Sequence, residues 1–164
     1  MRGGEGYAET NRENFSIEGE IMGLEDVYTE LVSEHSRNPE NRHALPGANC
    51  SLKGHNPSCG DEITLQLKIE DGIVKDAAFT GVGCAISQAS TDMMIDLIRG
   101  KSIAKARELA GKFIGMIKRE ITDDDELEEL DEALALKNVS NMPARVKCAV
   151  LAWHTLDDAL KEEK

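Results

Sequence analysis

The fold class is decided by residues 63–80, which read ITLQLKIEDGIVKDAAFT. The first seven of these residues alternate between apolar and polar side chains, the pattern of a half-buried β-strand. Asp71-Gly72 is a hairpin turn signal, so the chain is predicted to return as a second strand over residues 73–80. A short first strand is predicted over residues 48–52, because Pro46-Gly47 and Lys53-Gly54 punctuate the loop around it.

Helical periodicity flanks this hairpin on both sides. Apolar residues recur at intervals of three and four, which predicts helices over residues 24–36, 85–99, 103–117 and 144–161. Ser102 is predicted to cap the third of these helices, and Pro143 suits the first position of the last one. Strands followed by helices predict an α+β domain, with a small antiparallel β-sheet of about three strands and helices packed on one face.

Length, charge and hydropathy limit the possible function classes. The 164 residues favour a single domain, expected over residues 22–164 behind a flexible extension at residues 1–21. The formal net charge of -12 argues against binding to nucleic acid. No apolar run approaches the ~20 residues that span a membrane. Without a secretory signal pattern a cytoplasmic location is expected, where the four cysteines would be free, metal-bound or catalytic.

Two of the cysteines lie at structural joints that suit a reactive or metal-binding thiol. Cys59 and Asp61 share a tight turn directly before the predicted strand, and both have the residue parity of its buried side chains. Cys84 follows the glycine-rich joint Gly81-Val82-Gly83 at a predicted helix N-terminus, where the helix dipole favours a thiolate. A thiol and a carboxylate are therefore predicted to be ordered together in one turn.

A third cysteine, Cys148, follows Arg145 and Lys147, whose positive charges would support a thiolate. Three thiols and one carboxylate are ligands that zinc and iron accept. Two other interpretations stay open at this point. Cys84 and Cys148 could be small buried hydrophobic residues, and Asp61 could be a turn residue that accepts backbone N–H groups.

Other candidate residues are predicted to be ordinary. Cys50 is interpreted as a bystander, and His55 as a histidine that faces the solvent, although it could serve as a ligand or proton shuttle. The remaining histidines give no functional signal: His35, His43 and His154. Eight of the ten residues from Asp123 to Glu132 are acidic. This segment is predicted to be a solvated surface or a short helix, or else a lid or docking element for a basic partner.

Three cysteine motifs follow one another along the chain: NPSCGD at residues 56–61, GVGCAIS at 81–87 and PARVKCA at 143–149. In this order they resemble the IscU/NifU N-terminal family of iron–sulfur cluster assembly proteins, over roughly residues 24–160. Within that family the chain is most similar to the SufU branch. Lys147 stands where the scaffold branch carries a histidine, and the acidic segment matches an insertion of the SufU branch.

The resemblance implies a zinc site made by Cys59, Asp61, Cys84 and Cys148. It also implies that Cys59 accepts sulfur from the persulfide of a PLP-dependent cysteine desulfurase of the SufS type. A histidine of that partner can take the place of Cys59 on zinc, and downstream iron–sulfur scaffold proteins would receive the sulfur. The alternative is a scaffold that uses the same ligands to assemble and transfer a [2Fe–2S] cluster. Whether such a sulfurtransferase-like carrier counts as an enzyme is left open.

Overall fold

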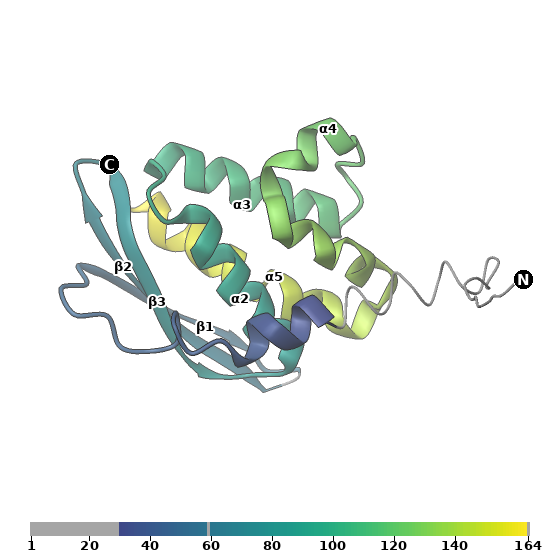
Figure 1. The fold of residues 1–164 in the computed structure, drawn as a ribbon, viewed down its shortest axis with the longest axis horizontal. Helices are drawn as coiled ribbons and strands as arrows, with labels where there is room; N and C mark the ends of the chain where they lie inside the picture. Colours follow the sequence, from purple (N-terminus) through teal and green to yellow (C-terminus); the bar gives the residue numbers. More distant parts are fainter. Residues whose placement is uncertain (1–29, 59, 164) are drawn as a thin grey trace, which may run out of the picture. The chain divides into compact units, whose positions relative to one another are not determined.

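A computed structural model describes residues 30–58 and 60–163 of the chain (Figure 1). Contacts divide the chain into two units, Met1–Leu31 and Val32–Lys164, and every contact discussed below lies within the second unit. The extension predicted at residues 1–21 and the predicted domain start at residue 22 lie outside the described residues. The first predicted helix is described from residue 30 and runs to residue 37.

Three antiparallel strands form the sheet in the order β1-β2-β3 (Figure 1). They are β1 at Cys50–Asn56, β2 at Asp61–Glu70 and β3 at Ile73–Val82. The predicted alternation holds along β2, where Ile63, Leu65 and Leu67 are fully buried while the residues between them are half-buried. The hairpin predicted around Asp71-Gly72 is therefore confirmed, with both strands slightly longer than predicted.

The first strand begins later and ends later than the predicted residues 48–52. It continues through Gly54, which the sequence placed in a loop. The reason is a close approach of the last helix, because a Cβ at Gly54 would lie 2.1 Å from Oγ1 of Thr155. A glycine inside a strand often marks such an approach rather than a turn. The prediction for this strand was wrong in its bounds because the close contact comes from a residue far along the chain.

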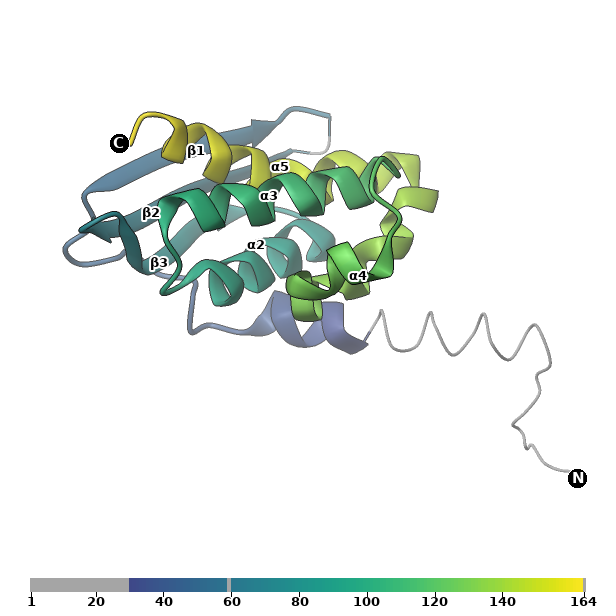
Figure 2. The same cartoon turned by 90° about the horizontal axis from the view of Figure 1, so that it is seen from above.

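The three helices predicted over residues 85–99, 103–117 and 144–161 are confirmed to within one residue, and two further helical segments, α4 and η1, lie between the second and third of them. Their bounds are α2 at Ala85–Ile98, α3 at Ile103–Ile117, α4 at Asp124–Leu127, η1 at Glu128–Asn141 and α5 at Pro143–Lys161. α2 and α5 pack directly on one face of the sheet, and α3 and η1 pack on that helix pair (Figure 1 and Figure 2). The predicted α+β architecture is thus confirmed. Within the described residues, no helix is both long and apolar enough to cross a membrane.

The core continues from the sheet into the space between α2, α3 and α5. Trp153 is fully buried, and its ring stacks on Phe113 with the centroids 4.2 Å apart. Its Nε1 donates a hydrogen bond of 2.8 Å to Oγ of Ser90, which in turn donates to the carbonyl oxygen of Ala149 at 2.6 Å. This chain of contacts fixes α2, which starts directly after Cys84, against α5, which carries Cys148.

The acidic segment is folded onto the helices rather than merely solvated. The predicted short helix is α4, and η1 continues it as a 3₁₀ helix with a kink at Asp131, where φ is 54°. Its apolar side chains are buried: Leu127, Leu130, Ala133, Leu136 and Val139. On the charged side, hydrogen bonds from Lys105 and then Lys112 lower the pKa of Glu129 to about 2. The segment therefore has an apolar inner face and a charged attachment to α3.

Candidate metal centre

Two thiols and one carboxylate from three different elements converge at one point. Asp61 opens β2, Cys84 is the N-cap residue of α2, and Cys148 lies in the second turn of α5. One ligand atom from each of the three lies within 4.8 Å of the other two. Asp61 and Cys148 are buried and Cys84 is half-buried. The fold thus brings together three of the four residues that the sequence proposed as metal ligands.

The fourth proposed ligand, Cys59, lies outside the described residues, but the residues on both sides of it are described. The N–H of Gly60 donates to the carbonyl oxygen of Asn56 at 3.0 Å, and the N–H of Ser58 donates to Oδ1 of Asn56 at 3.2 Å. Asn56 pairs with Asp61 across the β1–β2 hairpin. Ser58 and Gly60 are therefore tied to Asn56, the residue that pairs with the buried Asp61.

Asp61 is tied to the helix that presents Cys84. The backbone N–H of Cys84 donates to Oδ1 of Asp61 at 3.0 Å, so the carboxylate accepts a hydrogen bond at the start of α2. The thiol of Cys84 makes no capping hydrogen bond to this helix. Gly83 permits the arrangement, because a Cβ there would lie 2.9 Å from Oδ1 of Asp61 and 3.0 Å from Oγ of Ser87. As the residue parity predicted, Asp61 is as fully buried as Ile63.

Positive charge reaches the thiols from α5. The pKa of the Arg145 guanidinium is raised, chiefly by Coulombic attraction to Cys84 and next by a hydrogen bond to Cys148. Arg145 thus places a positive charge beside both cysteines. The other proposed supporting charge, Lys147, is exposed on the same helix.

The donor set suits a divalent ion that prefers sulfur. In a tetrahedral site with Zn–S bonds of about 2.3 Å, neighbouring sulfurs lie roughly 3.8 Å apart. The three ligand atoms of Asp61, Cys84 and Cys148 all lie within 4.8 Å of one another, so each pair is at most about one ångström wider than that spacing. Beside the carboxylate, the buried Oγ of Ser87 has no hydrogen-bond partner among the described residues. Both the chemistry and the spacing fit zinc.

The remaining cysteine is well separated from this group. Cys50 opens β1 and pairs with Leu67, whereas Asn56 at the other end of the strand pairs with Asp61. At the rise of a β-strand, the two ends lie about 20 Å apart. Burial raises the pKa of the Cys50 thiol, and the charges of Glu163 and Glu162 raise it further. These features match the bystander that the sequence predicted.

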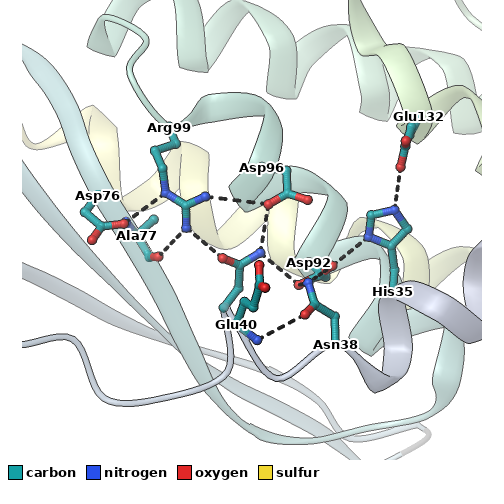
Figure 3. A network of polar contacts seen from close by, with 10 residues as sticks. His35, Asn38, Glu40, Asp76, Ala77, Asp92, Asp96, Arg99 and Glu132 are labelled. Atoms are coloured by element: carbon teal, nitrogen blue, oxygen red, sulfur yellow. Dashed lines mark hydrogen bonds and ion pairs between the residues drawn. The ribbon is translucent and has the colours of Figure 1, made fainter.

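A second group of possible ligands, His35, Asp92 and Asp96, also lies within 4.8 Å. Hydrogen bonds occupy its polar atoms (Figure 3). Nδ1 of His35 lies 2.6 Å from Oδ2 of Asp92, and Nε2 lies 2.7 Å from Oε1 of Glu132. The amide of Asn41 donates to Asp92 at 2.8 Å and to Asp96 at 3.0 Å, so it bridges the two carboxylates. This group is a satisfied polar network that attaches the segment before β1 to α2.

His35 was wrongly expected to be an ordinary histidine. Its side chain is 11% exposed and lies between two carboxylates. Burial lowers its pKa, but hydrogen bonds to Asp92 and Glu132 outweigh that effect and leave the pKa raised. These partners are 57 and 97 residues away in the sequence, so no local pattern could have indicated them.

The chain is similar to known proteins over most of its length. The family model described as NifU-like N terminal domain matches residues 27–163. The iron–sulfur cluster assembly scaffold protein IscU of Thermotoga maritima is 41% identical over 141 residues, which cover 86% of this chain and 97% of that protein. The zinc-dependent sulfurtransferase SufU of Bacillus subtilis is 38% identical, with 86% and 94% covered.

A solved structure supports the same relationship. The crystal structure from Fervidobacterium islandicum, described as a candidate iron–sulfur cluster assembly scaffold protein for the SUF system, aligns with a TM-score of 0.75. Its sequence is 36% identical, and the alignment covers 80% of this chain and 94% of that one. Sequence and fold therefore point to the same group of proteins.

Proposed function

The chain belongs to the family of NifU-like N-terminal domains, and on that premise we propose that it is a zinc-dependent sulfur acceptor in iron–sulfur cluster assembly. One observation carries the proposal. Asp61, Cys84 and Cys148 converge on one point, and Ser58 and Gly60, the sequence neighbours of Cys59, are tied to Asn56, which pairs with Asp61. Three ligands from rigid elements and one from a turn suit a site in which one ligand exchanges while the others hold the ion.

Each residue then has a separate role. Asp61, Cys84 and Cys148 would anchor the zinc ion, and Cys59 would be the exchangeable fourth ligand. Bound zinc supplies a redox-inactive positive charge that keeps thiols deprotonated without oxidising them. Arg145, which interacts with both anchoring thiols, would offset part of the negative charge of the ligand set.

Sulfur transfer needs one nucleophilic step at Cys59. Its thiolate attacks the outer sulfur of the persulfide on a PLP-dependent cysteine desulfurase of the SufS type. A new S–S bond forms on Cys59 while the S–S bond of the donor breaks, and the electron pair leaves with the donor's cysteine as a thiolate. The step involves no net oxidation. Cys59 then holds a persulfide whose outer sulfur can pass to a downstream iron–sulfur scaffold protein.

The second candidate function is a scaffold for [2Fe–2S] assembly. Thiolates ligate iron–sulfur clusters as readily as zinc, so the geometry of Cys84 and Cys148 suits both. Lys147 favours the acceptor, because by resemblance the scaffold branch carries a histidine immediately before its third cysteine. Anaerobic reconstitution with iron and sulfide separates the two functions. A stable coloured cluster that passes intact to an apo-ferredoxin would favour the scaffold.

The acceptor function is tested with two cysteine variants. Native mass spectrometry of protein purified without added metal should show about one zinc per chain. The parent protein should accelerate a cysteine desulfurase and gain the mass of one sulfur atom. Cys59→Ala should lose both properties, and Cys50→Ala, which changes a cysteine at the far end of the hairpin, should keep both. The proposal fails if Cys59→Ala stimulates the desulfurase as well as the parent does.

A further inference from the structure

The buried polar side chains of α2 are satisfied unevenly. In its second turn, Oγ of Ser90 donates to Ala149 and Oγ1 of Thr91 donates to the carbonyl oxygen of Ser87 at 2.8 Å. Ser87 itself is only 1% exposed, yet its own Oγ has no hydrogen-bond partner among the described residues. A buried hydroxyl without a partner loses its hydration and gains nothing in return. Such a group calls for an explanation in the surroundings of the first turn.

The hydroxyl of Ser87 lies beside the candidate metal centre. A Cβ placed on Gly83 would be 3.0 Å from Oγ of Ser87 and 2.9 Å from Oδ1 of Asp61, so the two oxygens flank the same point. Ser87 is also the third residue of α2, whose N-cap residue is Cys84. The hydroxyl therefore belongs to the same helical turn as one proposed ligand and adjoins the carboxylate of another.

The start of α2 explains why this hydroxyl remains available as a donor. At many helix starts the side chain of the third residue accepts the N–H of the N-cap residue. Here the N–H of Cys84 donates to Asp61 instead, at 3.0 Å. Asp61 thus replaces Ser87 as the capping acceptor. A carboxylate has about four lone-pair sites, so Asp61 can accept a hydrogen bond from Ser87 beside that from Cys84 and still bind an ion.

We propose that Ser87 is a positioning residue of the metal centre, whose hydroxyl donates to the Asp61 carboxylate when an ion is bound. Two donors on one carboxylate oxygen, the Cys84 N–H and the Ser87 O–H, would hold the other oxygen toward the ion. Hydrogen bonds of this kind, made to ligands rather than to the ion, typically change metal affinity by about 10–100-fold. The inference rests on the proposed function, because it requires Asp61 to be a ligand.

Ser87→Ala tests the inference, and Thr91→Val is its matched control. Both remove one buried hydroxyl from α2, but the hydroxyl of Thr91 bonds within the helix, one turn away from the centre. Zinc affinity is measured by competition with a chromophoric chelator. Ser87→Ala should bind zinc about 10–100-fold more weakly than the parent, and Thr91→Val should remain within about threefold. Equal affinity of the parent and Ser87→Ala would overturn the inference.

Thermal unfolding with and without zinc separates positioning from packing. In the metal-free protein, Ser87→Ala removes a hydroxyl that has no partner, so its Tm should equal or exceed that of the parent. On adding zinc its Tm should rise less than that of the parent, because the stabilisation follows the affinity. A Tm lowered equally in both forms would show a packing role and refute the inference. A parent that binds no zinc would refute the proposed function itself.

Discussion

Replacing His35 by alanine is expected to destabilise the domain by about 3 kcal/mol at or below neutral pH. Its two ring nitrogens lie 2.6 Å from Asp92 and 2.7 Å from Glu132, and both partners are carboxylates (Figure 3). A neutral imidazole carries one N–H and cannot donate to both. The geometry therefore requires the charged form of His35. In His35→Ala, the buried carboxylate of Asp92 loses this cationic partner.

The size of the destabilisation expected for His35→Ala follows from the burial of Asp92, whose side chain is 0% exposed. Breaking a buried ion pair costs about 3–5 kcal/mol. The lower end applies because the amides of Asn41 and Asn38 still donate to Asp92 at 2.8 and 3.3 Å. Glu132 is 60% exposed, so its pair with His35 adds little. With a urea m-value of about 2 kcal/mol per molar, the unfolding midpoint should fall by about 1.5 M.

The stability that His35 contributes should decrease as the pH rises. The pKa of His35 is raised above its ordinary 6.5 in the folded protein. Its contribution is therefore fully present below about pH 6.5 and is lost as the pH rises through the folded value. The unfolding free energies of the parent and of His35→Ala should therefore converge as the pH rises above about 6.5 and through the folded value.

Urea unfolding followed by the fluorescence of Trp153, the single tryptophan, measures both the loss of unfolding free energy and its dependence on pH. His154→Ala is the control, because it removes an exposed histidine from the same domain. It should change the unfolding free energy by less than about 0.5 kcal/mol. A difference between parent and His35→Ala that stays constant across the pH range would contradict the charged state. A difference as small as that of the control would contradict the role of His35.

Three further predictions concern the centre, the acidic segment and the core. Gly83→Ala should weaken zinc binding about tenfold, because its Cβ would press on the Asp61 carboxylate. Gly111→Ala has open space and should leave binding unchanged while it stabilises α3 by about 0.5–1 kcal/mol. Glu129→Gln should speed amide exchange in η1 at neutral pH, because it removes the carboxylate that binds Lys105 and Lys112. In the parent, the protection of η1 that comes from Glu129 should be complete above pH 4.5 and should be lost as the pH falls through about 2. Hydrogen exchange measures the protection, and carboxyl NMR measures the titration of Glu129. Ser90→Ala should cost about 1–3 kcal/mol in urea unfolding, because it unpairs the buried indole N–H of α5.

The sequence predicted those parts of the fold that local patterns determine. Alternation over residues 63–69 and the Asp71-Gly72 signal act between near neighbours, and the hairpin formed as predicted. Gly54 was wrongly placed in a loop because its role depends on Thr155, a residue 101 positions away that occupies the space beside it. The acidic segment was only half predicted, since its charges are visible in the sequence but the surface that buries Leu127 and Leu136 is not.

The candidate centre shows the same division. The position of Cys84 at a helix start, that of Cys148 in the last helix after Arg145 and Lys147, and the parity of Asp61 could be predicted because each depends on its own element. Their convergence within 4.8 Å is a property of the assembled fold, and the sequence predicted it chiefly through the resemblance to a family. His35 offered no such motif, and only the packing of the segment before β1 against α2 and η1 gives it two carboxylate partners.

The stretch Ser87 to Asp92 shows most clearly what a pattern of residue types cannot say. This stretch holds three hydroxyl residues within two turns of one helix: Ser87, Ser90 and Thr91. The sequence alone gives no reason to expect different roles for them. In the folded chain, the hydroxyl of Ser90 donates to the neighbouring helix α5, and the hydroxyl of Thr91 donates within α2. The hydroxyl of Ser87, at the end of α2 beside Asp61, has no hydrogen-bond partner among the described residues. Oε1 of Gln88 is another buried side-chain atom of α2 without a hydrogen-bond partner among the described residues, but the hydroxyl of Ser87 adjoins the carboxylate of Asp61. The comparison of Ser87→Ala with Thr91→Val therefore measures directly whether that hydroxyl acts on the metal centre.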